Sequence, residues 1–183
     1  VVGGQDELVF DGGGMAVAAD GTVATRSELF REGLLTVDVA PAGGTWVPAP
    51  GRLAAMPDAV EEVYEALKIG LRDYVDKNGF PGVIVALSGG IDSALVATIA
   101  VDALGKDRVF GVTLPSVITS KETFADALEL AKRLGIPCPQ IPIAPAVDAL
   151  AGMLDPACAA VDWARPLPGT LMEENLQARI RGV

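Results

Sequence analysis

Short apolar runs alternate with longer amphipathic segments in the second half of the chain. Residues 83–87 are apolar and rich in β-branched side chains, which predicts a strand covered on both faces. A helix is predicted over 93–104, ending at Gly105, and a second strand over 108–114. This strand–helix–strand order is typical of a parallel sheet with right-handed crossovers, and therefore of an α/β fold.

An amphipathic helix is predicted ahead of this sheet. Asp58 can cap its first turn, with Glu61 three residues on, and Gly79 can end it. Its apolar residues fall on one face at helical spacing: Val60, Val63, Tyr64, Leu67, Leu71, Tyr74 and Val75. We therefore expect this face to be buried.

Further helices and one weak strand are predicted after the second strand. Thr119 and Glu122 form a capping box for a helix that runs to Gly135. Residues 136–143 indicate a third strand that is either broken or confined to a sheet edge, because three prolines interrupt the run. A short helix is expected over 146–154.

Residues 1–40 are patterned as a β-meander. Asp20-Gly21 predicts a two-residue hairpin turn between two short strands, and apolar residues over 34–39 suggest a third strand. Strands this short bury too little surface to fold alone, so we expect the segment to complete a sheet in a neighbouring domain. Proline and glycine are frequent over 41–57, as in a linker.

Composition excludes several classes of protein. Hydrophobic residues make up 50% of the 183 residues, which excludes disorder of the whole chain, and no apolar run is long enough to cross a membrane. Lys and Arg number 14 against 24 Asp and Glu, a net charge of −10, which argues against nucleic-acid binding because such a surface must be basic. The chain holds no histidine, which removes Ser-His-Asp and Cys-His catalysis and most zinc sites.

The two cysteines point to a reducing compartment. Cys138 and Cys158 form no CxxC motif and no disulfide framework, so we interpret both as small buried hydrophobes. The sequence shows no basic segment followed by an apolar one of the secretory type. The expected location is the cytoplasm.

Residues 88–93, with the sequence SGGIDS, carry the candidate chemistry. They lie between the first strand of the α/β unit and the following helix, where ligands bind in parallel sheets. The two glycines let the backbone approach a ligand, the amides at the helix start attract an anion, and the two serines add hydroxyl groups. Asp92 would repel a phosphate group unless Mg²⁺ bridges the two. The loop therefore predicts a site for a magnesium-bound polyphosphate, although GxxxxGK[ST] and GxGxxG motifs are absent from the sequence.

This loop resembles the SGGxDS motif of the N-type ATP pyrophosphatases, or PP-loop enzymes, which cleave ATP to AMP and pyrophosphate while adenylating a substrate. Three further segments resemble glutamine-dependent NAD⁺ synthetases. Residues 3–12 are similar to the last part of their nitrilase-type glutaminase domain, and parts of 114–127 to the stretch after their second strand. Residues 174–182, in a helix opened by the capping box of Thr170 and Glu173, are similar to the helix that lines their deamido-NAD⁺ site.

The resemblance implies three regions. Residues 1–40 would be the C-terminal strands of a truncated nitrilase-like glutaminase domain, 41–57 a linker, and 58–183 the N-terminal half of the ATP-pyrophosphatase domain. The fold of that half would be a Rossmann-like parallel sheet of the adenine nucleotide α-hydrolase type. The second acidic metal ligand and the glutaminase triad of the family would fall outside these residues, so we expect the chain alone to be incomplete and inactive.

The implied activity is that of a ligase. The carboxylate of deamido-NAD⁺ attacks the α-phosphate of ATP, pyrophosphate leaves, and ammonia from glutamine then displaces AMP to give NAD⁺. The residues assigned to ATP are Ser88, Gly89, Gly90, Asp92 and Ser93. Asp92 is also assigned to Mg²⁺, and Asn175 and Arg179, one turn apart, are assigned to deamido-NAD⁺. Positioning and charge neutralisation would carry catalysis, no side chain is assigned a covalent role, and a homo-oligomer is expected.

Two other interpretations stay open. A GMP-synthetase-like enzyme would keep the loop and change the substrate, whereas a non-catalytic ATP-binding sensor would keep only nucleotide binding. Val117 and Ile118 stand where the family often has an arginine or another polar residue and then tyrosine, near the adenine pocket. Arg179 and Arg181 could equally be solvated charges on their helix.

Overall fold

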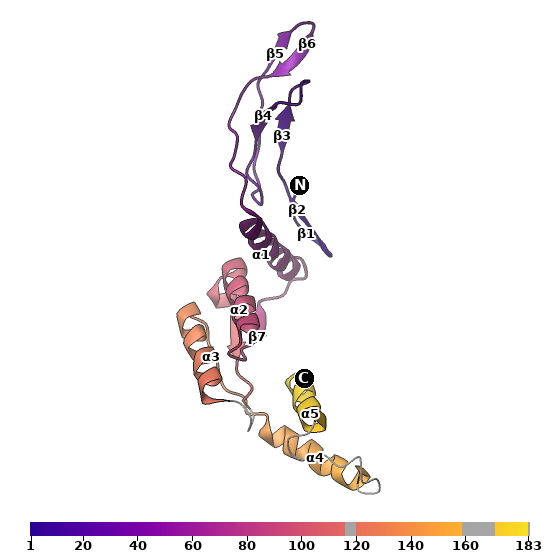
Figure 1. The fold of residues 1–183 in the computed structure, drawn as a ribbon, viewed down its shortest axis with the longest axis vertical. Helices are drawn as coiled ribbons and strands as arrows, with labels where there is room; N and C mark the ends of the chain where they lie inside the picture. The colour runs from indigo at the N-terminus through magenta and orange to yellow at the C-terminus, as the bar shows by residue number, and fades with distance from the viewer. Residues whose placement is uncertain (116–119, 159–170, 183) are drawn as a thin grey trace. The chain divides into compact units, whose positions relative to one another are not determined.

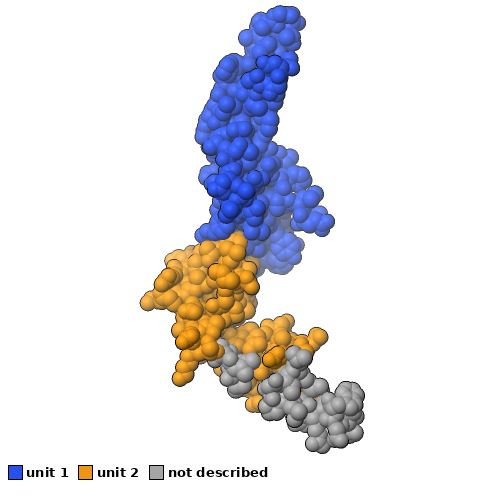
Figure 2. All heavy atoms as spheres, in the orientation of Figure 1, with its two compact units in different colours: residues 1–82, 102–104 blue, residues 83–101, 105–183 orange. Residues whose placement is uncertain are grey.

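The computed structural model describes residues 1–115, 120–158 and 171–182. The chain divides into two compact units, residues 1–82 with 102–104 and residues 83–101 with 105–183 (Figure 2). Along the described part of the chain, three β-hairpins and a long helix come first. A strand, a helix and a second strand follow, and then further helices (Figure 1).

Antiparallel hairpins build most of the first unit. They pair β1 (Val2–Gln5) with β2 (Leu8–Asp11), β3 (Met15–Val17) with β4 (Val23–Arg26), and β5 (Val39–Ala42) with β6 (Thr45–Pro48) (Figure 1). Each pair forms a sheet of its own, so the predicted meander consists of separate two-stranded hairpins.

The predicted strand over 34–39 is wrong, because β5 begins only at Val39 and pairs with β6. A hairpin therefore occupies part of the predicted linker 41–57. Gly43 and Gly44 connect its strands with φ angles of +59° and +83°. Two consecutive residues at positive φ make a type I′ turn, whose twist matches that of the flanking strands. Glycine here indicates a tight hairpin rather than a flexible linker.

The predicted two-residue turn at Asp20-Gly21 is a three-residue loop instead. The N–H of Ala18 donates to the carbonyl of Thr22 at 2.8 Å, and the N–H of Gly21 donates to the carbonyl of Ala18 at 2.9 Å. Gly21 has a φ of +88°, and Asp20 Oδ1 accepts a hydrogen bond from the N–H of Thr22 at 2.9 Å. Asp20 and Gly21 thus mark the position of the turn correctly. The loop is one residue longer than predicted, and it still uses the positive φ of glycine and the side-chain acceptor of aspartate.

The long helix α1 (Ala59–Lys77) begins and ends as the sequence predicts. Asp58 Oδ1 accepts hydrogen bonds from the N–H groups of Val60 and Glu61, each at 2.9 Å. Gly79 follows the last turn with a φ of +69°, and the backbone hydrogen bonds around it form a Schellman motif. Both predicted ends of α1 are confirmed. They were predictable because a helix cap depends only on residues within one turn of the helix end.

The predicted buried face of α1 is largely wrong. Val60, Val63 and Leu67 are 80%, 59% and 50% exposed. The helix instead packs against β1 and β2 near Gly70, whose Cα would lie 3.1 Å from a Cβ added to Gly4. Such a close backbone approach needs residues without side chains, which a search for apolar spacing does not mark.

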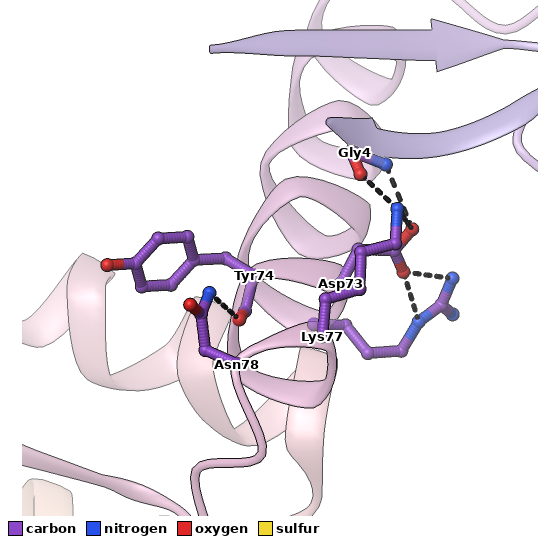
Figure 3. A network of polar contacts seen from close by, with 6 residues as sticks. Gly4, Asp73, Tyr74, Lys77 and Asn78 are labelled. Atoms are coloured by element: carbon purple, nitrogen blue, oxygen red, sulfur yellow. Dashed lines mark hydrogen bonds and ion pairs between the residues drawn. The ribbon is translucent and has the colours of Figure 1, made fainter. Parts of the chain in front are cut away.

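Polar contacts join β1 to α1 in the same region (Figure 3). The N–H of Gly4 donates to Asp73 Oδ2 at 2.9 Å, and Lys77 Nζ donates to the carbonyl of Gly4 and lies 3.5 Å from Asp73 Oδ2. Burial favours a higher pKa for Asp73. The Gly4 N–H and the charges of Arg72 and Lys77 outweigh it and hold the pKa of Asp73 below its ordinary value. An ionised carboxylate therefore connects the hairpin to the helix.

The second unit is built on a parallel pair of strands, as predicted. β7 (Val83–Ala86) and β8 (Val109–Val112) pair in parallel, and α2 (Ile91–Leu104) makes the crossover between them. We predicted that β7 is covered on both faces. Within the described residues it is covered on one face only, because Val85 is buried whereas Ile84 is 74% exposed. A short apolar run suits a half-covered strand as well as a fully covered one, so the pattern cannot separate the two.

Residues 136–143 form no regular strand but follow β8 as an irregular edge. The N–H groups of Gly111 and Thr113 donate to the carbonyls of Pro137 and Pro139 at 2.9 and 3.0 Å, and the N–H of Ile141 donates to the carbonyl of Thr113 at 2.9 Å. The next bond of a parallel ladder would need an N–H at position 139, which proline lacks. The predicted disruption by proline is confirmed.

The remaining helices differ from prediction mainly at their ends. α3 (Lys121–Leu134) is capped by Ser120, whose Oγ accepts from the N–H of Thr123 at 3.1 Å, while Thr119 of the predicted box lies outside the described residues. α4 (Ala144–Cys158) is longer than the predicted helix. α5 (Leu171–Arg181) is the predicted last helix, although the Thr170 cap is outside the described residues.

Two smaller predictions concern membranes and thiols. Every helix in the described part of the chain is too short or too polar to cross a bilayer. Cys138 is only half-buried, and its burial raises the pKa of the thiol, which keeps the group neutral. The side chain of Cys158 is outside the described residues.

Candidate functional site

The SGGIDS loop closes on itself through its two serines. It connects β7 to α2, with Gly90 at the N-cap position of the helix. Ser93 Oγ donates to the carbonyl of Gly90 at 3.0 Å and accepts from the N–H of Ser88 at 3.2 Å. Ser88 Oγ lies 3.1 Å from Ser93 Oγ and accepts from the N–H of Gly90 at 3.2 Å. The loop is therefore held in one shape by its own hydroxyl groups.

Gly89 is the residue that sets the place of the loop against α3. Its φ is +83°, and a Cβ there would lie 2.0 Å from the carbonyl oxygen of Thr123. No side chain fits at this distance, so the loop backbone lies directly on the first turn of α3. We predicted that both glycines allow close approach to a ligand. The structure shows that Gly89 allows close approach to α3.

The N-terminus of α2 can receive an anion. No side chain caps it, and Asp92 is the acidic residue of its first turn. Unpaired amides at a helix start, together with the helix dipole, attract phosphate groups. The N-terminal turn of α2 thus offers donors on the same loop as an exposed carboxylate.

The donor chemistry of the loop suits magnesium rather than a softer metal. Among the described residues, no group of three or more His, Cys, Asp or Glu side chains comes together. Mg²⁺ commonly takes only one or two protein carboxylates and completes its shell with water and substrate phosphates. Asp92, beside an anion-binding helix start, fits that pattern.

A cavity of about 440 Å³ lies at the carboxyl ends of β7 and β8. Its apolar lining comes from Ala86, Leu87, Leu114, Pro115 and Phe124. Hydroxyl groups are contributed by Ser88 from the loop and by Ser120 and Thr123 from the start of α3; Thr113 and Arg181 complete the described lining. This edge of a parallel sheet is where ligands bind in open α/β folds. An apolar slot beside an anion-binding loop suits a nucleotide, with the base in the slot and the phosphates at the loop.

The predicted site residues fall into two groups. Ser88, Gly89, Gly90, Asp92 and Ser93 lie together in the loop, and Ser88 also lines the cavity. Asn175 and Arg179 are exposed on α5 and are not in the lining. Val117 and Ile118 are outside the described residues.

Sequence reasoning missed the lining residues outside the loop. The sequence pattern marks Arg181 as a helix charge and gives Phe124 no place in a site. One signal could have found Phe124: it lies in the first turn of the helix that follows the second strand, the element that borders this edge of the sheet. The sequence holds no such signal for Arg181, because its i+4 spacing from Gln177 becomes informative only once the structure shows that Gln177 is buried.

Comparison with known proteins matches the chain to a known family. The NAD synthase family model matches residues 63–183. The chain is 42% identical over 186 residues to a glutamine-dependent NAD⁺ synthetase of Rhodobacter capsulatus, a match that covers all of this chain and 32% of that protein. The chain thus spans about a third of the length of the curated relatives that it matches.

Solved structures agree with this match. A glutamine-dependent NAD⁺ synthetase of Acinetobacter baumannii, in complex with adenosine diphosphate, superimposes with a TM-score of 0.89 at 38% identity over 99% of this chain and 33% of that one. An ammonia-dependent NAD synthetase of Campylobacter jejuni, in complex with nitrate, gives a TM-score of 0.55 at 32% identity over 67% of this chain and 48% of that one. Proteins of this kind have the Rossmann-like fold of the adenine nucleotide α-hydrolase type, so the predicted fold class is confirmed.

Proposed function

This chain belongs to the NAD synthase family, and from that premise we propose that it carries part of the site of a ligase that amidates deamido-NAD⁺ to NAD⁺. The carboxylate of deamido-NAD⁺ attacks the α-phosphate of ATP, so that an adenylate forms and pyrophosphate leaves. Ammonia then attacks the activated carboxyl carbon, and AMP leaves as the amide forms. The observation that carries this proposal is the SGGIDS loop at the carboxyl end of β7, beside the cavity.

In this proposal the chain binds and positions rather than forming covalent intermediates. The first-turn amides of α2 hold the phosphates, and the Ser88–Ser93 pair keeps the loop in the shape that presents them. Gly89 lets α3 support that loop from behind. Holding the reacting groups in line and neutralising their charge are the main sources of rate in phosphoryl and acyl-adenylate chemistry of this type.

Asp92 would hold Mg²⁺ at the same loop. The ion neutralises charge on the phosphate oxygens when it is bound. Without such a cation, the Asp92 carboxylate would repel the polyphosphate that the helix start attracts. Asp92 therefore makes nucleotide binding dependent on a divalent cation.

We further propose that the nitrogen donor is glutamine. Curated relatives named glutamine-dependent match 99–100% of this chain, whereas the ammonia-dependent synthetase covers 67% and the family model begins at residue 63. The remaining first third is accounted for if residues 1–40 belong to a nitrilase-like glutaminase domain, 41–57 connect the domains, and 58–183 form the first half of the synthetase domain. Asn175 and Arg179 remain our assignment for deamido-NAD⁺, and the proposal includes a cytoplasmic homo-oligomer.

Product analysis of the protein at its natural length tests the proposal. With Mg-ATP, deamido-NAD⁺ and glutamine, AMP and NAD⁺ should form in equal amounts. Asp92→Ala should abolish both products, whereas Asp107→Ala removes a carboxylate from the surface of the same unit and should leave them unchanged. Amidation of xanthylate in place of deamido-NAD⁺ would indicate a GMP-synthetase-like enzyme. ATP binding without pyrophosphate release would indicate a sensor.

A further inference from the structure

One positive charge reaches the cavity from a distant part of the chain. Among the described residues that line the cavity, Arg181 at the end of α5 is the only one with a charged side chain. The other lining residues are apolar or carry hydroxyl groups. Arg181 is separated in sequence from the SGGIDS loop by the whole of α2, β8, α3 and α4, so the tertiary fold alone brings it to this position.

Arg181 is exposed, but it lies on the side of α5 that also carries a buried residue. Gln177, four residues earlier and therefore on the same side of the helix, is only 2% exposed. Arg179, two residues before Arg181, lies on a different side of the helix; it is exposed, as Arg181 is, but it does not line the cavity. The packing of α5 thus presents Arg181 rather than Arg179 to the cavity.

A positive charge in the cavity would offset the negative charge of a bound polyphosphate. The SGGIDS loop contains no Lys or Arg and includes the Asp92 carboxylate, and the chain has a net charge of −10. A polyphosphate brings further negative charge to this edge of the sheet. Arginine is always protonated, and its planar guanidinium group can donate two parallel hydrogen bonds to a phosphate group.

We propose that Arg181 binds the phosphate groups of the nucleotide that the SGGIDS loop holds. This inference rests on the proposed function, because it takes the cavity to be the ATP site. Arg181 acts as a binding and positioning residue: it donates hydrogen bonds to phosphate oxygens, offsets the charge of Asp92, and links the position of α5 to the presence of nucleotide.

Calorimetric binding of ATP and of adenosine to the protein at its natural length tests this role. Arg181→Gln should weaken ATP binding about 10- to 100-fold, the loss expected for a charge-assisted hydrogen bond, and leave adenosine binding within about twofold. Arg181→Lys keeps the charge and should recover part of the loss. Arg133→Gln removes a charge from the exposed face of α3, where Arg133 pairs with Glu129, and should bind ATP as the wild type does.

Each result of this experiment has one meaning. Unchanged ATP affinity in Arg181→Gln would overturn the assignment and leave the ligase proposal standing, provided that the wild type still forms NAD⁺. An equal loss of ATP and adenosine affinity would also overturn it, because Arg181 would then act on the base or on the packing of the cavity. If the wild type binds no ATP, both proposals fail together.

Discussion

At the scale of single residues, the loop between β7 and α2 is organised before any ligand arrives. The hydroxyl hydrogen of Ser93 goes to the carbonyl of Gly90, so the hydroxyl hydrogen of Ser88 is the one shared with Ser93 Oγ. Ser88 Oγ in turn accepts from the N–H of Gly90. We predicted the serines as direct phosphate donors. Their bonds to each other give them an additional role, because a loop already held in its binding shape loses less entropy on binding.

Gly89→Ala should damage this loop more than other substitutions at positive φ. The new Cβ would lie 2.0 Å from the carbonyl oxygen of Thr123, so either the loop or α3 must move. We expect the free energy of unfolding to fall by roughly 3 kcal/mol or more and ATP binding to be lost. Urea unfolding and calorimetry measure the two effects.

Gly79→Ala provides the matched control. Gly79 also has a positive φ, +69°, but no atom lies within 4 Å of its added Cβ. Gly79→Ala should therefore lower the free energy of unfolding only by the backbone strain, about 1 kcal/mol. Equal losses of stability in the two variants would show that the contact of Gly89 with α3 is not what requires glycine.

At the scale of elements, the ends of helices follow from local signals, whereas the buried faces follow from what packs against them. Asp58 and Gly79 begin and end α1 as predicted, since each acts within one turn. The face of α1 that meets β1 was not predicted, because it is chosen by a close approach at Gly70 and by Asp73. Apolar spacing identifies a helix face that can be buried, but it does not tell which other element packs against the helix, or where.

Asp73→Asn should make the stability of the first unit less dependent on pH. The pKa of Asp73 in the folded chain is below its ordinary value of about 3.9. Its stabilising contribution is therefore complete above about pH 4 and is lost as the pH falls through the lower, folded-state pKa. We expect the variant to lose roughly 1–2 kcal/mol at pH 7 and much less at about pH 2.5. Urea unfolding at both pH values is the measurement, and an equal loss at each would contradict the expectation.

At the scale of the whole molecule, the cavity combines residues that no short stretch of sequence contains. Ser88 follows β7, Leu114 follows β8, Phe124 lies in α3 and Arg181 ends α5. The loop was predictable because its residues are adjacent. The rest of the lining was not predictable. It depends on the parallel pairing of β7 with β8, and on how α3 and α5 pack at the carboxyl ends of these two strands.

Binding of Mg-ATP should therefore stabilise the second unit. At a concentration 100 times the dissociation constant, ATP should raise its free energy of unfolding by about 2.7 kcal/mol. Removing magnesium with EDTA should reduce this gain in the wild type. In Asp92→Asn the repelling charge and the metal ligand are both lost, so the gain should no longer depend on EDTA. Hydrogen exchange of the α2 amides measures the effect, and a wild-type gain that is insensitive to EDTA would contradict the metal role of Asp92.

The sequence by itself determined the order of the elements from α1 to α5, the capped ends of α1, the parallel pairing of β7 with β8, and the loop that marks the family. These features depend on residues that are neighbours in the chain or on the handedness of a crossover, so a single sequence contains them. Only the tertiary structure decided that α1 meets β1 at Gly70, that α3 supports Gly89, and that Arg181 rather than Arg179 faces the cavity. These choices depend on contacts between distant segments, where the shape of each surface selects its partner.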